Sequence, residues 1–262
     1  METRHMNKDW SSSQYLKFEK ERTKPAEDLL YRISSRCEPE IAIDLGCGPG
    51  NSTDLLKRAF PRASIVGIDS SEDMITKAQD KYPDILFKKE NVTELKGNFD
   101  VIFSNACLQW IPDHNRLLPD LISHLNKGGY FAAQIPKNES EPLFQIIKEV
   151  ADEPEWGFGN VDLPYNKTLE VQEYFEILSV CASEIDIWET KYFHRMKSHS
   201  MLLEWVKGSR LRPYLDVLSD EAAVRFENEI LTRVEIAYPM MKNGEIIFGF
   251  NRLFITSIKR KE

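Results

Sequence analysis

Three glycines at alternate positions, Gly46, Gly48 and Gly50, follow a short apolar run that contains Asp44. Asn51 follows the last glycine, and helix-forming residues come next at positions 54–58. Glycine tolerates positive φ and carries no Cβ, so the chain can turn sharply here and a ligand can lie against its backbone. The free N–H groups at the start of the helix favour a polar or anionic ligand group. We therefore expect a nucleotide-like ligand to lie across this turn, in contact with Asp44, the three glycines and Asn51.

A second apolar run, residues 63–69, ends in Asp69. An acid at the tip of the second strand of a parallel sheet is placed to accept hydrogen bonds from both hydroxyls of a ribose. The glycine spacing differs from the G-x-G-x-x-G of dinucleotide enzymes, and the Gly-Lys-Ser/Thr of a P-loop is missing. The two runs together predict a nucleotide-like ligand that is neither a dinucleotide nor held by a P-loop.

Further ligand contacts are expected where later elements meet the same edge. Ser70 follows Asp69 and belongs to a capping segment, while Met74 lies one turn into the next helix, where it covers an adenine face or is a core methionine. Asn91 and Val92 follow a short third strand, at the place where a polar group would meet an adenine amino group. Asn105 ends the fourth strand and completes the expected cofactor-binding set.

The elements that position these residues alternate between strand and helix. Apolar runs closed by Gly, Pro or Asn predict the strands, and helical spacing after Pro or Ser predicts the helices. The predicted strands of the first half are residues 40–45, 63–69, 85–90, 99–105 and 130–136, and the predicted helices are residues 26–36, 72–81 and 117–125. In open parallel sheets, ligands bind at the carboxyl ends of strands where the strand order reverses. The loop after the fourth strand, with Gln109, Trp110 and His114, should therefore line the reaction centre.

The second half of the chain is less regular. Helices are expected at residues 142–151, 169–182, 198–206 and 220–238, and strands at residues 184–193 and 244–258. The whole pattern predicts an α/β protein with a Rossmann-like, seven-stranded, mostly parallel sheet, helices on both faces and a helical lid inserted before the last strand. The expected parts are an N-terminal flap and helix (8–36), a core (37–196), a lid (197–243) and the final core strand (244–260).

Composition limits the classes of partner. The chain has 262 residues, 42% of them hydrophobic, and a formal net charge of −8. Such an acidic balance argues against nucleic acid or an anionic membrane as the main partner. No apolar run is long enough to cross a bilayer and no signal segment opens the chain. Four scattered cysteines suggest neither a metal site nor a disulfide framework, so we expect a cytoplasmic protein with reduced thiols and no metal.

The chain resembles the family of trans-aconitate 2-methyltransferases. The resemblance lies in residues 44–52, 69–71, 105–114 and 211–213, and it extends over nearly the whole chain. The glycine pattern by itself is similar to the broad class I S-adenosylmethionine-dependent methyltransferase superfamily, whereas the loops with Trp110 and Arg212 are more specific. Two positions depart from the family pattern: Asn91 stands where an acid is usual, and Arg210 where glycine is common.

The resemblance implies S-adenosylmethionine as cofactor and transfer of its methyl group to one carboxylate of trans-aconitate or a related small polycarboxylic acid, forming a monomethyl ester. A carboxylate is ionised at neutral pH, so positioning suffices and no catalytic base is required. An acidic protein must then hold a tri-anion by local cations, and arginine matches carboxylate geometry. The expected substrate contacts are Tyr15, Arg22, Trp110, His114, Arg195, Arg212 and Arg252. Arg22 and Arg212 are the strongest candidates for clamps.

Two alternatives to this interpretation differ in chemistry. A methyltransferase acting on a non-carboxylate oxygen or nitrogen would need a general base such as His114. A cofactor-binding protein without turnover would keep the glycine turn and Asp69 but would need no aromatic loop. The chain is expected to be a monomer or a weak homodimer.

Overall fold

The computed structural model describes residues 18–160 and 168–261. By the contacts within the chain, these residues form two compact units. The sheet unit comprises residues 18–136, 168–190 and 252–261, and the second unit comprises residues 137–160 and 191–251. The second unit is thus larger than the expected lid of residues 197–243, because it also takes in residues 137–160 and parts of the last two strands. Tyr15 lies outside the described residues.

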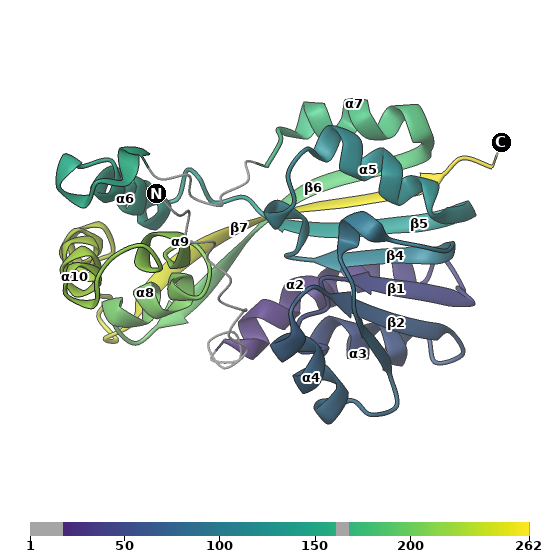
Figure 1. Cartoon of the computed structure of the whole chain (residues 1–262), viewed down its shortest axis with the longest axis horizontal. Helices are drawn as coiled ribbons and strands as arrows, with labels where there is room; N and C mark the ends of the chain where they lie inside the picture. The colour runs from purple at the N-terminus through teal and green to yellow at the C-terminus, as the bar shows by residue number, and fades with distance from the viewer. Residues whose placement is uncertain (1–17, 161–167, 262) are drawn as a thin grey trace, which may run out of the picture. The chain divides into compact units, whose positions relative to one another are not determined.

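A seven-stranded sheet organises the sheet unit. The strands are β1 (Ile41–Leu45), β2 (Ser64–Asp69), β3 (Leu86–Lys89), β4 (Phe99–Asn105), β5 (Leu125–Pro136), β6 (Ala182–Met196) and β7 (Ile246–Lys259). Their order is β3-β2-β1-β4-β5-β7-β6, and Figure 1 shows most of them side by side in this order. Strands β1 to β5 pair in parallel and β7 pairs antiparallel with β5. The predicted mostly parallel, Rossmann-like sheet is therefore confirmed. Strand order reverses between β1 and β4, which places the expected ligand edge at the ends of these two strands.

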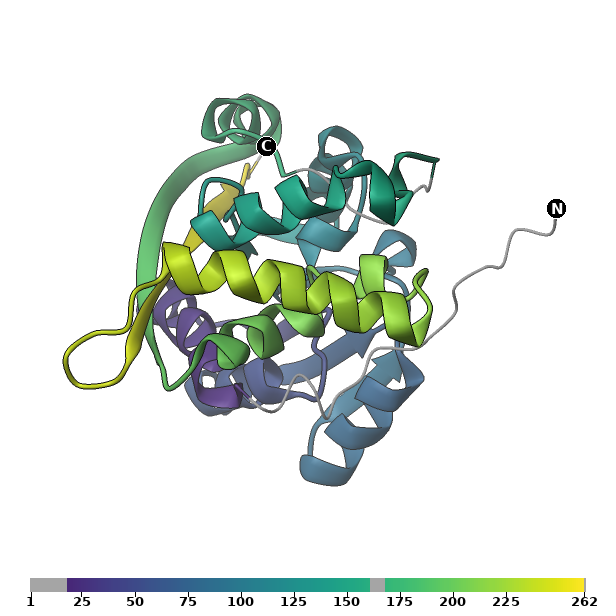
Figure 2. The ribbon, with the colours of Figure 1, turned by 90° about the vertical axis from the view of Figure 1, so that its left-hand side faces the viewer.

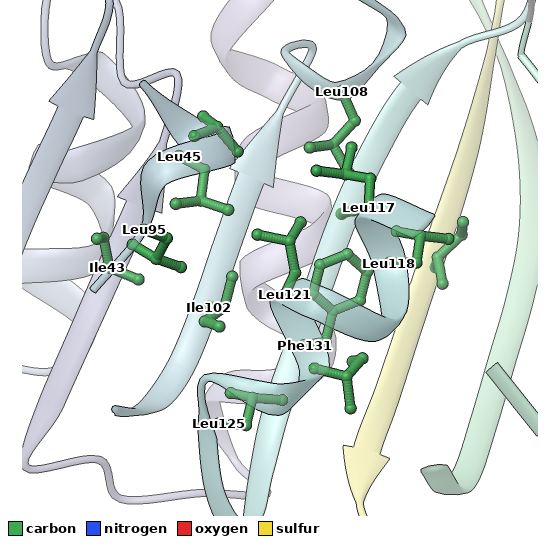
Figure 3. Close-up of a cluster of buried hydrophobic side chains, with 14 of the residues drawn as sticks. Ile43, Leu45, Leu95, Ile102, Leu108, Leu117, Leu118, Leu121, Leu125 and Phe131 are labelled. Atoms are coloured by element: carbon green, nitrogen blue, oxygen red, sulfur yellow. The ribbon is translucent and has the colours of Figure 1, made fainter. Parts of the chain in front are cut away.

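One face of the sheet is packed against α5 (His114–Ser123) and α7 (Val171–Cys181). Leu117, Leu118 and Leu121 of α5 lie against Ile102 and Phe131 of the central strands, as Figure 3 shows. All five side chains are at most 5% exposed. Burial of this size, at about 25 cal/mol per Å², is the main force that holds the strands in register. Because side chains alternate along a strand, the residues next to these core positions must point to the opposite face.

The opposite face carries α2 (Glu19–Ser34), which packs against β5 and α3 (Asn51–Ala59). The chain leaves α2 beside the first half of β5, because the Tyr130 hydroxyl donates a hydrogen bond to the carbonyl of Arg36, just after the helix (3.2 Å). A helix of 16 residues is roughly 24 Å long. The first turn of α2, with Arg22, therefore lies toward the carboxyl edge of the sheet.

The start of α2 differs from the prediction. The sequence predicts that Pro25 opens the helix, yet the helix begins at Glu19 and contains Pro25 in its interior. Proline lacks the N–H that would bond to the carbonyl four residues earlier, so one helical bond is lost. The preceding turn is held by the bond from the Arg22 N–H to the Phe18 carbonyl (3.0 Å) and by burial of Phe18. These contacts offset the lost bond.

The remaining elements of the sheet unit are short. Helix α4 (Glu72–Lys81) is capped by the Ser71 hydroxyl, which accepts a hydrogen bond from the Met74 N–H (3.3 Å). Two 3₁₀ turns, η1 (Val92–Glu94) and η2 (Leu108–Trp110), follow β3 and β4. Strand β5 begins at Leu125, five residues earlier than the sequence predicts, and it contains Gly128 with φ +76°.

The second unit is mainly helical. Its helices are α6 (Pro142–Ala151), α8 (His199–Lys207), α9 (Arg212–Leu215) and α10 (Asp220–Ala237), with 3₁₀ turns η3 (Pro154–Trp156) and η4 (Phe158–Asn160). Helix α10 packs against both α6 and α8, and Figure 2 shows it between them. Ser198 caps α8, as predicted, by accepting a hydrogen bond from the Met201 N–H (3.4 Å). In the described part of the chain, no helix combines the length and apolar character that a bilayer crossing requires.

Candidate active site

The glycine turn joins β1 to α3, and each of its glycines has a positive φ. A Cβ on Gly46 would lie 2.2 Å from Cys107 Sγ, and one on Gly50 would lie 2.8 Å from the Tyr82 ring. These two glycines are therefore required by packing as well as by φ. A Cβ on Gly48 would meet only Met74 Sδ, at 4.0 Å, within 4 Å. The space that a Cβ on Gly48 would occupy is thus open, with the Met74 sulfur beside it.

Asp69 organises the same turn from the end of β2. One carboxylate oxygen accepts a hydrogen bond from the Gly48 N–H (2.9 Å) and the other from the Ser71 N–H (2.9 Å). A carboxylate oxygen can accept more than one hydrogen bond, which is the capacity that a ribose contact would use. Asp69 therefore links the glycine turn to the start of α4, at the position from which the sequence predicts a ribose contact.

Asp44 is fully buried at the end of β1. Its Oδ2 accepts hydrogen bonds from Ser52 Oγ and Thr53 Oγ1, both at 2.7 Å, at the start of α3. Burial raises the pKa of Asp44 to about 7; the two hydroxyls oppose this rise, and the nearby Asp69 charge adds to it. An aspartate poised at this pKa would be held ionised by a cationic ligand group.

Replacing Asp44 by Asn should make stability less dependent on pH. Asparagine keeps an oxygen for Ser52 and Thr53 but carries no charge. The folded-state pKa of Asp44, about 7, lies above the ordinary value of about 3.9, so the folded protein binds this proton more tightly than the unfolded chain does. The stabilisation that protonated Asp44 gives the folded wild-type protein is therefore present at low pH, and it is lost as pH rises from about 4 to about 7.

The unfolding free energy of Asp44→Asn relative to wild type should consequently increase over the same pH range. The increase should be at most about 1.4 kcal/mol for each pH unit, because one proton is bound or released. Urea denaturation of the ligand-free proteins at several pH values measures it. A difference between the two proteins that does not change with pH would contradict the raised pKa of Asp44.

Other predicted cofactor residues have defined partners. Asn51 Oδ1 accepts hydrogen bonds from Lys81 Nζ (3.1 Å) and the Tyr82 hydroxyl (3.4 Å). Asn91 Oδ1 caps η1 by accepting from the N–H and hydroxyl of Thr93, both at 3.0 Å. A carboxylate oxygen at this position could accept the same two hydrogen bonds, so the asparagine that stands here in place of the usual acid keeps the local fold. Ser70 is exposed, and the adjacent Ser71 makes the cap.

The loop after β4 is bounded by two residues in left-handed backbone conformations, Ala106 (φ +55°) and Asp113 (φ +56°). Such conformations are disfavoured for residues other than glycine and tend to be retained where function requires them. Gln109 Nε2 donates to the Ala106 carbonyl (2.7 Å), which bridges the loop. Trp110, in η2, is half-buried in the same loop.

His114 does not present a free ring nitrogen. Its Nε2 lies 2.9 Å from the Leu108 carbonyl, and its Nδ1 lies 2.7 Å from the Tyr174 hydroxyl. A carbonyl only accepts, so Nε2 carries the proton and Nδ1 accepts from Tyr174. Tyr174 in turn accepts from the Leu169 N–H (3.3 Å). His114 is only 3% exposed, and both ring nitrogens are engaged within the protein, one with the loop itself and one with Tyr174 of α7.

Four polar residues at the carboxyl edge point to the face on which α2 packs: Asp44, Asn105, Gln134 and Arg252. Along their strands, Asp44, Gln134 and Arg252 each adjoin residues of the core cluster on the opposite face, so their own side chains point away from it. Asn105 pairs in register with Gln134 and therefore shares its face. Arg252 is 3% exposed, and its Nη1 donates to Gln134 Oε1 (3.0 Å). This edge of the sheet thus holds a buried guanidinium.

The other predicted arginines are placed differently. Arg22, in the first turn of α2, is half-buried in the sheet unit. Arg195 is exposed on β6 and forms a two-pronged ion pair with Glu245 (2.9 and 2.8 Å). Arg212 begins α9 and pairs with Asp216 (3.4 Å). Arg195 and Arg212 belong to the second unit, as does the half-buried Arg210.

Several buried atoms at the ligand edge have no hydrogen-bond partner among the described residues. Three are acceptors: Asp44 Oδ1, Asn105 Oδ1 and Gln109 Oε1. Buried polar atoms are nearly always bonded, so such a group indicates a missing donor. Asp44 and Asn105 stand on adjacent strands and on the same face. A ligand ammonium group would satisfy these oxygens, while Asp69 and the open Gly48 suit a nucleoside. The residues thus fit a nucleoside ligand that carries an amino group.

Thiol and metal chemistry are not indicated by the described residues. Burial raises the pKa of the Cys47 and Cys107 thiols well above the usual value, so both are protonated at neutral pH. Within residues 18–160 and 168–261, no group of three or more His, Cys, Asp or Glu side chains is arranged to hold a metal ion.

Solved structures share the fold. The YcgJ protein of Bacillus subtilis matches with a TM-score of 0.57 at 16% identity, covering 91% of this chain and 100% of that one. Phosphoethanolamine N-methyltransferase 2 of Haemonchus contortus, in complex with S-adenosyl-L-methionine, also matches with a TM-score of 0.57, at 17% identity over 90% of this chain and 52% of that one.

Sequence relatives are much closer. A family model described as a methyltransferase domain matches residues 18–179. The trans-aconitate 2-methyltransferase of Escherichia coli O7:K1 is 41% identical over 251 residues, which cover 95% of this chain and 98% of the relative. That of Variovorax paradoxus is 38% identical over 259 residues, covering 96% and 99%. With this identity over nearly its full length, the chain belongs to the trans-aconitate 2-methyltransferase family of methyltransferases.

Proposed function

We propose that this protein methylates one carboxylate of trans-aconitate, or of a closely related small polycarboxylic acid, with S-adenosylmethionine as methyl donor. The named activity of its relatives supports the substrate class. The observation on this chain that carries the proposal is the buried guanidinium of Arg252. Arg252 lies on β7, opposite the carboxyl end of β5, and on the same edge of the sheet as Asp44 and Asn105. A buried cation beside a nucleoside site is suited to an anionic acceptor.

The residues at this edge fit S-adenosylmethionine in three respects. Asp69 would accept from the ribose hydroxyls, and Gly48 would let the nucleoside approach the backbone. The unsatisfied oxygens of Asp44, Asn105 and Gln109 would accept from the ammonium group. When bound, S-adenosylmethionine supplies an electrophilic methyl group on a sulfonium.

The protein's own contribution is to position the acceptor. A carboxylate oxygen is already a nucleophile at neutral pH, so no proton has to be removed. Because His114 is engaged at both ring nitrogens, a base-dependent reaction on a phenol or amine lacks its expected base. Holding two reactants in line contributes roughly 7–11 kcal/mol in favourable cases. Arg252 binds the acid, and the loop with Trp110 excludes water from the reacting oxygen.

Arg22 and Arg212 are proposed as further contacts to the carboxylates that do not react. Arg22 lies in the helix turn that points to the carboxyl edge, within the same unit as Arg252. The proposal for Arg212 rests on the resemblance of its loop to the family. Arg195 is a weaker candidate, since Glu245 already compensates its charge.

A methyl-transfer screen over small di- and tricarboxylates, phenols and amines with labelled cofactor tests the function. We expect the highest kcat/KM with trans-aconitate and a base-labile methyl ester as product. Arg22→Lys and Arg212→Lys keep the charge but lose the planar fork, so each should raise KM and lower kcat for the acid while cofactor affinity is unchanged. A phenol or amine as the best acceptor would overturn the proposal.

A further inference from the structure

Gln134 is an isolated polar side chain in an apolar strand. It lies near the carboxyl end of β5, between Ala133 and Ile135, and its exposure is 0%. Its backbone carbonyl accepts from the Ala106 N–H (2.9 Å) at the start of the reaction-centre loop. The sheet thus holds residue 134 at the start of this loop, and the burial of its side-chain amide requires partners for the polar atoms of the amide.

The orientation of the Gln134 amide follows from its partner. Arg252 Nη1 lies 3.0 Å from one amide atom of Gln134. A guanidinium has only donors, so that atom must be the oxygen and the other must be the NH₂ group. Nε2 is buried and has no hydrogen-bond partner among the described residues. The Nε2 group of Gln134 thus carries two N–H donors that need an acceptor, and it lies next to the buried positive charge of Arg252.

Strand order separates this donor from the glycine turn and from Asp69, whereas Asn105 of β4 stands beside it. The glycine turn follows β1 and Asp69 ends β2, whereas Gln134 lies on β5, next to Asn105 of β4, and Arg252 lies on β7. Neighbouring strands are about 4.8 Å apart, so β5 lies roughly 10 Å and β7 roughly 14 Å from β1. A ligand that reaches both Gln134 and Arg252 is therefore on the acceptor side of the site.

We propose that Gln134 determines acceptor specificity by binding, together with Arg252, one carboxylate of the acceptor acid. Arg252 supplies the charge, and Gln134 Nε2 donates a hydrogen bond to a carboxylate oxygen. The Gln134 oxygen, by accepting from Arg252, also fixes the guanidinium. This inference rests on the proposed function only in its choice of acid.

Two substitutions test it. Gln134→Met keeps the volume and removes the donor, and Gln134→Glu keeps an oxygen toward Arg252 while replacing the donor with a second acceptor. Loss of a hydrogen bond to a charged group should raise the dissociation constant and KM for trans-aconitate roughly 10- to 100-fold in Gln134→Met. Gln134→Glu should be affected more, because its charge neutralises Arg252 and repels the acid. Ser257→Ala is the matched control, since it removes another buried polar atom without a partner among the described residues, elsewhere in the sheet.

The measurements are calorimetric binding of trans-aconitate in the presence of S-adenosylhomocysteine, and kcat/KM for trans-aconitate and for dicarboxylates that each lack one of its carboxyl groups. Gln134→Met should lose its preference for the triacid over the dicarboxylate that lacks the bound group, whereas a packing defect would lower all rates alike. Unchanged acid binding in both variants, an equal loss for every acid, or a loss of cofactor affinity overturns the inference. Weakened acid binding in a protein that transfers no methyl group would support it and would contradict the proposed function instead.

Discussion

Asp69→Ala should abolish measurable cofactor binding at micromolar concentrations. The substitution removes a ribose acceptor and also leaves the N–H groups of Gly48 and Ser71 without the carboxylate that holds them. A hydrogen bond to a charged group contributes about 1.5–3 kcal/mol, and each step of about 1.4 kcal/mol is tenfold in affinity. Loss of the ribose contact and of the ordered turn should raise Kd for S-adenosylmethionine by at least about a hundredfold. Isothermal calorimetry measures this change.

Asp54→Asn is a matched control, because Asp54 is an acid on α3 that pairs with Arg58 (2.8 Å) away from the turn. It should bind the cofactor as wild type does. Asp69→Asn should be intermediate, since its amide oxygen can replace only one of the two carboxylate acceptors. Cofactor binding in Asp69→Ala within about threefold of wild type would show that the nucleoside lies elsewhere.

The sheet could be predicted because each of its central strands is encoded locally. Apolar runs such as residues 63–69 and 99–105 are too short for buried helices, and polar or glycine residues close them. The extent of α2 could not be predicted in this way. Its first turn depends on burial of Phe18 within the folded unit, and local rules for Pro25 place the helix start later.

The cofactor edge is easier to predict than the acceptor side for a similar reason. Gly46 to Gly50 and Asp69 form a compact pattern in the sequence. By contrast, the role of His114 is decided by Tyr174, sixty residues later in the chain. Sequence reasoning missed Gln134, although a lone glutamine in the apolar run of residues 130–136 is a usable signal. Its partner Arg252 is brought to it only by the antiparallel pairing of β5 with β7.

Arg252→Met should eliminate most methyl transfer while leaving the cofactor site intact. Arg252 is nearly fully buried, and methionine fills similar volume without the charge or the bond to Gln134. Truncating one partner of a buried charge pair costs about 2–5 kcal/mol, so kcat/KM for trans-aconitate should fall by at least roughly 30-fold and by up to several thousandfold. Steady-state kinetics together with calorimetry of S-adenosylmethionine separate the two sites, and the cofactor Kd should stay within about threefold of wild type.

Arg252→Lys distinguishes charge from geometry. Lysine keeps the positive charge but is a point donor without the planar fork, so it should recover part of the affinity for the acid and little of kcat. If Arg252→Met turns over trans-aconitate normally, the buried guanidinium is a structural element of the β5–β7 pair, and Arg22 becomes the main clamp within the sheet unit. If Arg252→Met instead loses cofactor binding, the guanidinium faces the carboxylate of the cofactor, and the assignment of the acceptor side is wrong.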